Sequence, residues 1–293
     1  MSKAPVFRFA PSPNGALHLG HAYSALMNGR LSAAVGGRLL LRIEDLDRIR
    51  CKPEYESAIR DDLAWLGLVF AEPPRRQSEH GEDYARALDA LRARGLAYPC
   101  FCSRGAVAAA ATGRDPDGAP LYPGTCRSLR PRDVAARLAA GERAAWRLDL
   151  ARARAAAPAE LTWREFGEGE TAKRCVADCQ SWGDFVLRGR DAAASYHLAV
   201  VVDDGLQEIS DVVRGRDLFA ATSAHRLLQT LLGLPAPRYR HHRLALDANG
   251  DKMSKSAASI PLRALRAAGA TAEDLRVALG FAPGASRFAV RLS

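Results

Sequence analysis

The chain has 293 residues, of which 48% are hydrophobic and 26% charged, so a disordered or fibrous protein is excluded and one large domain with an insertion, or two domains, is expected. No apolar run approaches the roughly 18 residues of a membrane span and the start MSKAPVFRFA is not a signal peptide, which predicts a cytoplasmic protein. The 42 Lys and Arg exceed the 33 Asp and Glu by nine, and this favours a polyanionic partner, although a GC-rich genome would give the same Ala and Arg bias.

The first elements are predicted to form a βαβ unit. Val6 to Ala10 is expected to be a buried strand that ends at Pro11 and Pro13, and a helix should follow from about His18 to Val35. The next stretch, Arg38 to Glu44 (RLLLRIE), has almost no polar alternation, as in a parallel strand that is covered on both faces.

The middle of the chain departs from this rhythm. Two amphipathic helices are predicted at Pro53 to Leu66 and at Glu82 to Arg94. Residues 98–190 then combine Gly, Pro, short strands and a cluster of cysteines, which indicates an insertion. The doubly wound pattern resumes at Tyr196 to Asp204 and at Asp211 to Arg216.

A helix at about Thr222 to Leu232 and a strand at Arg240 to Leu246 complete the pattern. We therefore expect an α/β fold, a Rossmann-type doubly wound parallel sheet with an insertion and a short helical C-terminal segment. The expected divisions are the first half of the sheet domain at 1–97, the insertion at 98–190, the second half at 191–246 and the last segment at 247–293.

The stretch HLGH, His18 to His21, lies where a strand is predicted to end and a helix to begin. In an open α/β sheet, ligands bind at the carboxyl ends of the strands, where a helix presents free N–H groups and the positive end of its dipole. His18 and His21 can donate hydrogen bonds to phosphate oxygens there, and Gly20 lets a nucleotide approach the backbone. Taken alone, two such histidines are more often a helix cap or a surface feature.

The stretch KMSKS, Lys252 to Ser256, follows the turn sequence DANGD. It places the ammonium groups of Lys252 and Lys255 on a Gly- and Ser-rich loop, where they can follow a pyrophosphate as charge develops on it. The alternative for this stretch alone is a solvated basic loop. The two patterns in this order, each at a predicted strand end, are far more specific than either one.

Together, PSPNGALHLGH and KMSKS resemble the signature of class I aminoacyl-tRNA synthetases. More narrowly, RFAPSPNGALHLGHAYSAL, LRIEDLD, YHLAVVVDD and DVVRGRDL are similar to the catalytic domain of glutamyl-tRNA synthetases, from about Val6 to Ser256. The resemblance implies a reaction in which the glutamate carboxylate attacks the α-phosphorus of ATP, pyrophosphate leaves, and a hydroxyl group of tRNA then takes the acyl group. The protein would supply orientation and charge stabilisation, with no covalent nucleophile.

The resemblance also implies the residues of the ATP site. His18 and His21 would steady the phosphates and Lys255 the leaving pyrophosphate, as the catalytic groups. Gly20 and Lys252 would complete the ATP site, and Mg²⁺ is expected with the ATP.

The glutamate site implied by the resemblance consists of Arg8, Phe9, Ala10, Pro11, Ser12, Glu44, Tyr196 and Arg214. Arg8 and Arg214 would hold the two carboxylates and Glu44 the ammonium group. Ser12 and Tyr196 would add hydrogen bonds. Which arginine takes which carboxylate stays open, and an ordinary surface ion pair is the alternative for Glu44 and Arg214.

The cysteines account for the insertion. Cys100, Cys102 and Cys126 supply three thiolates within 27 residues, which leaves one tetrahedral position of a zinc ion for a phenolate oxygen or a water. The resemblance points to Tyr122 as the fourth ligand and to one Zn²⁺ per chain. The alternative is two buried cysteines and a stray third. The remaining cysteines are assigned no role: Cys51, Cys175 and Cys179.

Only 37 residues follow Ser256, enough for short helices at Pro261 to Ala268 and Ala272 to Leu279. A full glutamyl-tRNA synthetase has a helical anticodon-binding domain there, on the order of a hundred residues. The resemblance is therefore to the truncated branch of the family, which activates glutamate without tRNA and attaches it to queuosine at the wobble position of tRNA(Asp). Val200, which stands where glutamyl enzymes commonly have an asparagine, should weaken glutamate binding or indicate a different branch.

This branch implies a monomer whose partners are glutamate, ATP and a tRNA(Asp) anticodon stem-loop bearing queuosine, and no membrane. One alternative is a truncated glutamyl-tRNA synthetase that acts on a tRNA 3′ end. A second is a zinc-stabilised RNA-binding protein with a vestigial nucleotide pocket, which the intact HLGH and KMSKS disfavour. A small-molecule nucleotidylyltransferase or ligase would not need the glutamate-like set of residues.

Overall fold

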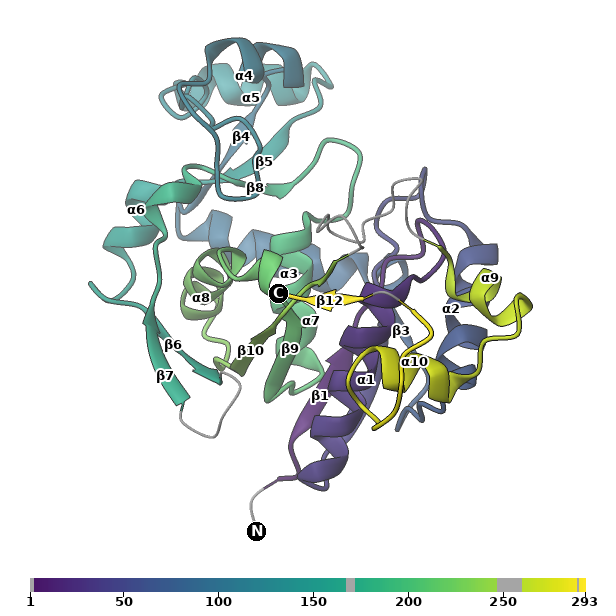
Figure 1. Ribbon diagram of the computed structural model, residues 1–293. Helices are drawn as coiled ribbons and strands as arrows, with labels where there is room; N and C mark the ends of the chain where they lie inside the picture. The colour runs from purple at the N-terminus through teal and green to yellow at the C-terminus, as the bar shows by residue number, and fades with distance from the viewer. Residues whose placement is uncertain (1–2, 167–171, 247–259, 289) are drawn as a thin grey trace.

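The centre of the protein is a seven-stranded sheet with the strand order β3-β2-β1-β9-β10-β6-β7 (Figure 1). The computed structural model describes residues 3–166, 172–246, 260–288 and 290–293. Neighbouring strands are parallel except for β6 and β7, so the predicted, mostly parallel α/β sheet is confirmed. The strands are β1 (Val6–Phe9), β2 (Arg38–Ile43), β3 (Arg75–Arg76), β6 (Thr162–Phe166), β7 (Ala172–Val176), β9 (Asp211–Gly215) and β10 (Arg238–His242).

The predicted βαβ unit is formed by β1, α1 (Leu19–Ala34) and β2. All four residues of β1 are buried, and β2 has five buried residues after the exposed Arg38, as expected for strands covered on both faces. On its other side β1 pairs with β9, through Phe7 and Asp211. The order of the strands therefore reverses beside β1, and α1 begins at the place where open α/β sheets bind their ligands.

The remaining longer helices are α2 (Pro53–Trp65), α3 (Gly81–Ala93), α7 (Tyr196–Leu206) and α8 (Ala221–Leu231). The stretch in which the doubly wound pattern was expected to resume is thus a helix, α7, which Ser195 caps. Every residue from Leu198 to Asp204 is buried, in a core shared with α3 and α8. A fully buried helix has no polar face, so its residue pattern is hard to distinguish from that of a buried strand.

The expected insertion, residues 98–190, divides between two sheets. One part is a three-stranded antiparallel sheet with three short helices, two of which lie with it at the top of Figure 1. Its elements are β4 (Ala97–Cys100), α4 (Arg104–Ala110), α5 (Pro131–Ala139), β5 (Ala145–Leu148), α6 (Leu150–Ala155) and β8 (Val186–Arg188). The other part, β6 and β7, returns to the central sheet, where Glu165 pairs with Tyr239 of β10. That pairing joins residues 74 positions apart, which no local pattern could reveal.

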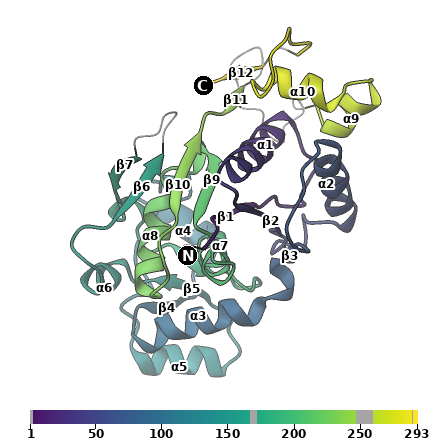
Figure 2. The ribbon, with the colours of Figure 1, turned by 90° about the horizontal axis from the view of Figure 1, so that it is seen from below.

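The C-terminal segment packs against the first half of the sheet domain (Figure 2). Its helices are α9 (Leu262–Ala267) and α10 (Ala272–Ala278), close to the predicted ranges. Leu262 of α9 and Leu275 of α10 are fully buried in one cluster with Ile59 of α2. These contacts attach the segment to the domain that holds the HLGH stretch.

The predicted strand at 240–246 is divided in two. Its first part belongs to β10, and its second part, β11 (Ala245–Leu246), pairs antiparallel with β12 (Arg291–Leu292) near the end of the chain. The described residues also form short 3-10 helices, η1 (Gln77–Glu79), η2 (Gln180–Trp182) and η3 (Arg216–Leu218). In the described parts of the chain, no helix has the length and apolar character to span a lipid bilayer.

Candidate functional site

His18 and His21 cap the N-terminus of α1. Nδ1 of His18 accepts a hydrogen bond from the N–H of Gly20 at 3.1 Å, and Nδ1 of His21 accepts from the N–H of His18 at 3.2 Å. The two ring centroids are 3.9 Å apart. Because both Nδ1 atoms are acceptors, the neutral rings carry their protons on Nε2, from which a hydrogen bond can be donated to a phosphate. The rings therefore cap the helix and can also serve the predicted ATP site.

The other two residues predicted for the ATP site, Lys252 and Lys255, lie outside the described residues. The last described residue before them is Leu246, at the end of β11. The structure therefore shows the histidine half of the predicted ATP site, at the start of α1, and gives no geometry for the lysine half.

Arg8, on β1, belongs to a buried network of charges. Its Nε donates to Oδ1 of Asp204 at 3.1 Å, and Nη1 of Arg42 donates to the same oxygen at 2.7 Å. Nη2 of Arg42 lies 3.4 Å from Oε1 of Glu44. A single carboxylate on α7 thus connects the predicted ligands Arg8 and Glu44 through Arg42. Among the described residues only Asp204 binds Arg8, so both terminal nitrogens of its guanidinium have no partner there.

Burial and charge oppose each other in this network. Burial by itself would lower the pKa of Arg42, but Asp204, Glu44 and Asp203 raise it. Burial would raise the pKa of Asp204, but Arg8 and Arg42 lower it. For Glu44 burial outweighs the nearby arginines and its pKa is raised. Neither Arg42 nor Asp204 was predicted from the sequence as part of the site, although a charge inside the apolar run RLLLRI and the pair DD in YHLAVVVDD were visible signals.

Arg214, on β9, faces Tyr196, the first residue of α7, at a distance of 3.4 Å between Nη1 and Oη. The arginine is 5% exposed, and His225, His241 and Thr222 surround it. Burial raises the pKa of Tyr196, so its hydroxyl stays protonated and can donate. The structure therefore brings these two predicted glutamate ligands together. It adds the two histidines, which belong to no motif recognised in the sequence.

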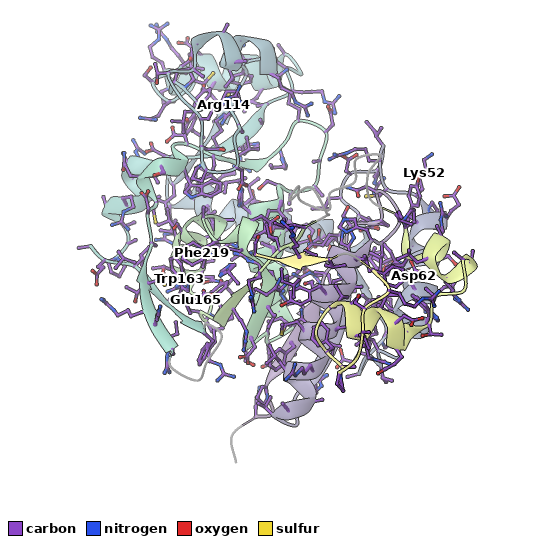
Figure 3. All side chains as sticks on the ribbon, in the orientation of Figure 1. Lys52, Asp62, Arg114, Trp163, Glu165 and Phe219 are labelled. Carbon is purple, nitrogen blue, oxygen red and sulfur yellow. The ribbon has the colours of Figure 1, made fainter. Side chains whose placement is uncertain are left out.

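The acidic partner of this second cluster is Glu165 on β6. Its Oε2 accepts hydrogen bonds from Nδ1 of His241 at 2.9 Å and from Nε1 of Trp163 at 3.0 Å. Trp163, Glu165 and Phe219 lie side by side in Figure 3, and the rings of Trp163 and Phe219 are 5.4 Å apart. The strand β6, which the sequence analysis had placed in an insertion, thus contributes to the surroundings of Arg214.

The remaining predicted glutamate residues lie on β1 and just after it. Phe9 and Pro11 are buried, and Ala10 and Ser12 are half-buried. The carbonyl of Pro11 accepts from the N–H of Glu44 at 3.0 Å, which attaches this turn to the end of β2.

Two residues outside the predicted set also have defined places. Sγ of Cys51, which had no assigned role, lies 3.6 Å from Oγ of Ser12 and 3.9 Å from the carbonyl of Glu44. Val200 is 2% exposed, on the same helix as Tyr196 and Asp204. The apolar side chain of Val200 therefore lies between the polar side chains of Tyr196 and Asp204 along α7.

Cys100, Cys102 and Cys126 lie together in the insertion, with their Sγ atoms all within 4.8 Å of one another. The Sγ atoms of Cys102 and Cys126 are 3.6 Å apart, and Oη of Tyr122 is also 3.6 Å from Sγ of Cys102. Tyr122 additionally accepts the N–H of Cys126 at 2.8 Å. A tetrahedral zinc ion with bonds of about 2.3 Å to sulfur and about 2.0 Å to oxygen would separate two sulfurs by about 3.8 Å, and a sulfur from the oxygen by about 3.5 Å. The separations of Cys102 from Cys126 and from Tyr122 match these values, and Sγ of Cys100 lies within 4.8 Å of the other two sulfurs.

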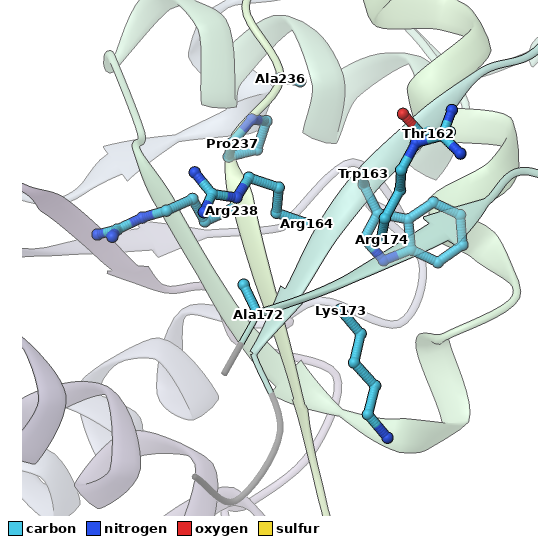
Figure 4. A pocket seen from close by; sticks show the side chains of 9 residues that line it. All are labelled: Thr162, Trp163, Arg164, Ala172, Lys173, Arg174, Ala236, Pro237 and Arg238. Atoms are coloured by element: carbon cyan, nitrogen blue, oxygen red, sulfur yellow. The ribbon is translucent and has the colours of Figure 1, made fainter. Parts of the chain in front are cut away.

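A separate hollow of about 400 Å³ lies at the edge of the central sheet, between β6, β7 and β10 (Figure 4). Its lining residues are Thr162, Trp163, Arg164, Ala172, Lys173, Arg174, Ala236, Pro237 and Arg238. Two of its four cations have acidic partners, since Arg174 pairs with Glu160 and Arg238 with Asp211. None of the predicted ATP, glutamate or metal residues is among those that line it, so this hollow is not the predicted pocket.

The family of the chain follows from its similarity to known proteins. The profile of the family described as "tRNA synthetases class I (E and Q), catalytic domain" matches residues 6–280. The chain belongs to this family of class I tRNA synthetases. The match covers the central sheet, the insertion and the helices α9 and α10, and it ends before β12.

The relatives of this class I synthetase include proteins named glutamyl-Q tRNA(Asp) synthetase and proteins named glutamate–tRNA ligase. A protein of Rhodobacter capsulatus named glutamyl-Q tRNA(Asp) synthetase is 44% identical over 292 residues, which cover 94% of this chain and 99% of the relative. A protein of the same name from Nitratidesulfovibrio vulgaris is 39% identical, with 92% and 83% covered. A protein of Nitrosococcus oceani named glutamate–tRNA ligase 2 is 38% identical, and the match covers 92% of this chain but 57% of that relative.

Among solved structures, the synthetase is similar to a glutamate tRNA ligase from Elizabethkingia meningosepticum, crystallised in complex with its amino acid. The TM-score is 0.71 at 26% sequence identity, and the match covers 92% of this chain and 54% of that one. This class I synthetase therefore spans about half the length of that ligase.

Proposed function

We propose that the protein uses ATP to activate glutamate to glutamyl-adenylate without tRNA, and then transfers the glutamate to queuosine at the wobble position of tRNA(Asp). The observation that carries this proposal is the 44% identity to the glutamyl-Q tRNA(Asp) synthetase of Rhodobacter capsulatus over 99% of that relative. The family, the paired HLGH and KMSKS stretches and the charged pocket support the activation step.

In the proposed glutamate site, the positive charges of Arg8 and Arg214 attract the two carboxylates of the substrate. Glu44, on the same network as Arg8, receives the ammonium group. Tyr196 and Ser12 add hydrogen bonds that fix the orientation of the side chain. Both arginines are almost fully buried, so their charges act in a medium where they are little screened.

In the proposed ATP site, His18 and His21 donate from Nε2 to phosphate oxygens, and Gly20 allows close approach. The α-carboxylate oxygen of glutamate attacks the α-phosphorus, the bond to the pyrophosphate oxygen breaks, and Lys252 and Lys255 receive the leaving charge. Mg²⁺ bound to ATP would share that charge. No side chain forms a covalent bond, so the protein contributes position and electrostatics.

The activation half is tested by exchange of labelled pyrophosphate into ATP in the absence of tRNA. Glutamate should support the exchange, whereas aspartate and glutamine should support it far less, because each lacks a match to two carboxylates at the glutamate spacing. Faster exchange with aspartate or glutamine would show that the assignment of the amino-acid pocket is wrong.

The acceptor half is tested with labelled glutamate and tRNA(Asp) anticodon stem-loops. A loop bearing queuosine should become labelled and the same loop bearing guanosine should not. The labelling should fall steeply with added salt, since phosphates are held by Lys and Arg. Labelling that ignores queuosine but is abolished by oxidation of the 3′-terminal ribose would instead support the second candidate, a glutamate–tRNA ligase, the name that the relative from Nitrosococcus oceani carries.

We also infer one zinc ion per chain, held by Cys100, Cys102, Tyr122 and Cys126 as a structural site. When bound, the ion would stabilise the insertion and would leave the chemistry to the sheet domain. Metal analysis of Cys126→Ser should find the zinc lost and the insertion more open to proteolysis, whereas Cys175→Ser, on β7 and outside the cluster, should keep it. Full zinc occupancy in Cys126→Ser would remove that residue from the site.

A further inference from the structure

Every N–H group of the Arg214 guanidinium has a protein partner. Nε donates to Nε2 of His241 at 3.1 Å. Nη1 lies 3.2 Å from Nδ1 of His225 and 3.4 Å from Oη of Tyr196. Nη2 donates to Oγ1 of Thr222 at 2.8 Å and to the carbonyl of Leu218 at 3.1 Å. Five donors thus meet five acceptors, which fixes the plane of the guanidinium before any ligand arrives.

All five acceptors are uncharged when the two imidazoles are neutral, so none of them neutralises the positive charge of Arg214. Within the described residues, no carboxylate forms an ion pair with Arg214, in contrast to Arg8 and Arg42. A buried arginine usually obtains a carboxylate partner, because burial of an unpaired charge is costly. The hydrogen bonds of Arg214 therefore fix the orientation of its guanidinium, and no carboxylate among the described residues neutralises its charge.

The hydrogen bonds determine the tautomers of the rings. Nε2 of His241 accepts from Arg214, so the ring proton is on Nδ1, which donates to Glu165 at 2.9 Å. Nδ1 of His225 accepts from Arg214, so its proton is on Nε2 and is donated to Nδ1 of His197 at 3.2 Å. The lone pairs of both rings therefore point at the guanidinium, and both protons point away from it.

The nearest carboxylates contact the histidine rings and not Arg214 itself. Glu165 lies on the far side of His241, and Oδ2 of Asp117 lies 3.7 Å from Nε2 of His197, two rings away from Arg214. Burial and the positive charge of Arg214 lower the pKa of His225, and burial and Arg214 also outweigh Glu165 in lowering that of His241. Both rings accordingly remain uncharged acceptors at neutral pH.

We propose that His225 and His241 are positioning residues, a neutral clamp that holds the Arg214 guanidinium in a fixed plane while leaving its positive charge uncompensated for a carboxylate of the amino-acid substrate. This inference rests on the proposed function. The weakest contact of the guanidinium is the one to Tyr196, at 3.4 Å beyond the usual hydrogen-bond length. A substrate carboxylate would enter between Arg214 and Tyr196, and the hydrogen bonds of Arg214 to His225 and His241 would be kept.

The test uses the full chain and compares His225→Ala with His225→Gln, whose amide oxygen can still accept from Arg214 without adding charge. His225→Ala should raise the KM for glutamate in pyrophosphate exchange by roughly 10- to 100-fold, the loss expected for a hydrogen bond to a charged group. The KM for ATP should change less than about twofold, because the affected contact is in the amino-acid site. His225→Gln should recover most of the affinity.

His241 and His242 provide a matched control, since they are adjacent buried imidazoles on β10. His241 contacts Arg214, whereas His242 accepts from or donates to no part of the clamp and lies 5.0 Å from the ring of Tyr23. His241→Ala should raise the KM for glutamate, and His242→Ala should leave it unchanged. Equal effects of the two substitutions would mean that loss of a buried ring, and not loss of the clamp, weakens binding.

Calorimetric titration with glutamate separates this inference from the proposed function, because binding needs no turnover. Wild-type protein that binds glutamate but does not exchange pyrophosphate would overturn the function and leave the clamp to be judged from the variants. Exchange by the wild type with an unchanged glutamate KM in His225→Ala would overturn the clamp alone. Absence of glutamate binding by the wild type would overturn both.

Discussion

The two arginines of the amino-acid pocket are held in opposite ways. Arg8 is attached through Nε to a carboxylate, Asp204, which also binds Arg42, and its terminal nitrogens have no partner within the described parts of the chain. Arg214 is attached at all five N–H groups, to rings, hydroxyls and a carbonyl. The charge of Arg8 is thus partly neutralised by Asp204, but some of its N–H donors have no partner among the described residues. In contrast, all N–H donors of Arg214 have partners, but none of these partners neutralises its charge. A buried cation can thus be prepared for an anionic ligand either by its free donors or by its uncompensated charge.

The largest effect is expected from removing the carboxylate of the Arg8 side. Asp204→Ala leaves Arg8 and the fully buried Arg42 with one carboxylate fewer, and it should reduce the free energy of unfolding by about 3–5 kcal/mol. Urea denaturation followed by circular dichroism measures this. Asp47→Ala, which removes an exposed pair with Arg50 and the hydrogen bonds from the N–H groups of Ile49 and Arg50, should cost clearly less. Similar losses in the two variants would mean that the buried network adds no special stability.

A smaller effect is expected from pH, which should change the free energy of unfolding through the buried histidines near Arg214. Burial, followed by Arg214, lowers the pKa of His197 to about 4 and lowers that of His225 well below its usual value, so the unfolded chain binds protons below pH 6.5 that the folded chain does not. The stability these rings contribute is therefore complete above pH 6.5 and is lost as the pH falls, by about 1.4 kcal/mol per pH unit for each ring. Asp204, whose pKa is lowered by Arg8 and Arg42, is fully effective above about 3.9 and weakens only below that.

Urea denaturation at pH 7.5, 6.5 and 5.5 measures this dependence. His225→Gln removes one titrating ring and should flatten the slope by the contribution of one proton. Ser223→Ala, which removes no titrating ring, serves as the control and should retain the wild-type slope. A wild-type stability that does not change between pH 6.5 and 5.5 would contradict the assignment of neutral, buried imidazoles.

The smallest effect is expected from a single hydroxyl. Thr222→Ala removes one acceptor of Arg214 and should reduce the free energy of unfolding by about 1 kcal/mol while raising the KM for glutamate. Ser223→Ala removes the neighbouring hydroxyl, which accepts from the N–H of Asp178, and should cost as much stability without changing that KM. Identical KM values in both variants would show that the closed set of contacts around Arg214 does not matter for substrate binding.

The sequence was sufficient for the parts of the site that lie within one motif. HLGH predicted the start of α1, and the run RLLLRIE predicted β2, because both signals are local. The three thiolates of the insertion were found in the same way, from close spacing. Their proximity is seen in the structure, where the Sγ atoms lie within 4.8 Å of one another.

The sequence could not reveal contacts between distant segments. Arg42 appeared as one polar letter in an apolar strand, and its burial makes sense only beside Asp204, 162 residues away. Likewise His225 and His241 belong to no motif, and their meaning depends on Arg214 on a neighbouring strand and on Glu165 on another. The helix α7 was hard to assign because burial on every side removes the polar face that identifies a helix.

The pairing of the chain's last residues with β11 has a consequence for covalent fusion to other proteins. Ser293 exchanges two backbone hydrogen bonds with Leu244, at 2.8 and 3.1 Å, so the carboxyl end of the chain is held three residues before the range that contains Lys252 and Lys255. The amino end lies apart from β11 and β12 in Figure 2. A partner protein fused after Ser293 would therefore begin beside Leu244 and β11, whereas one fused before β1 would begin away from them.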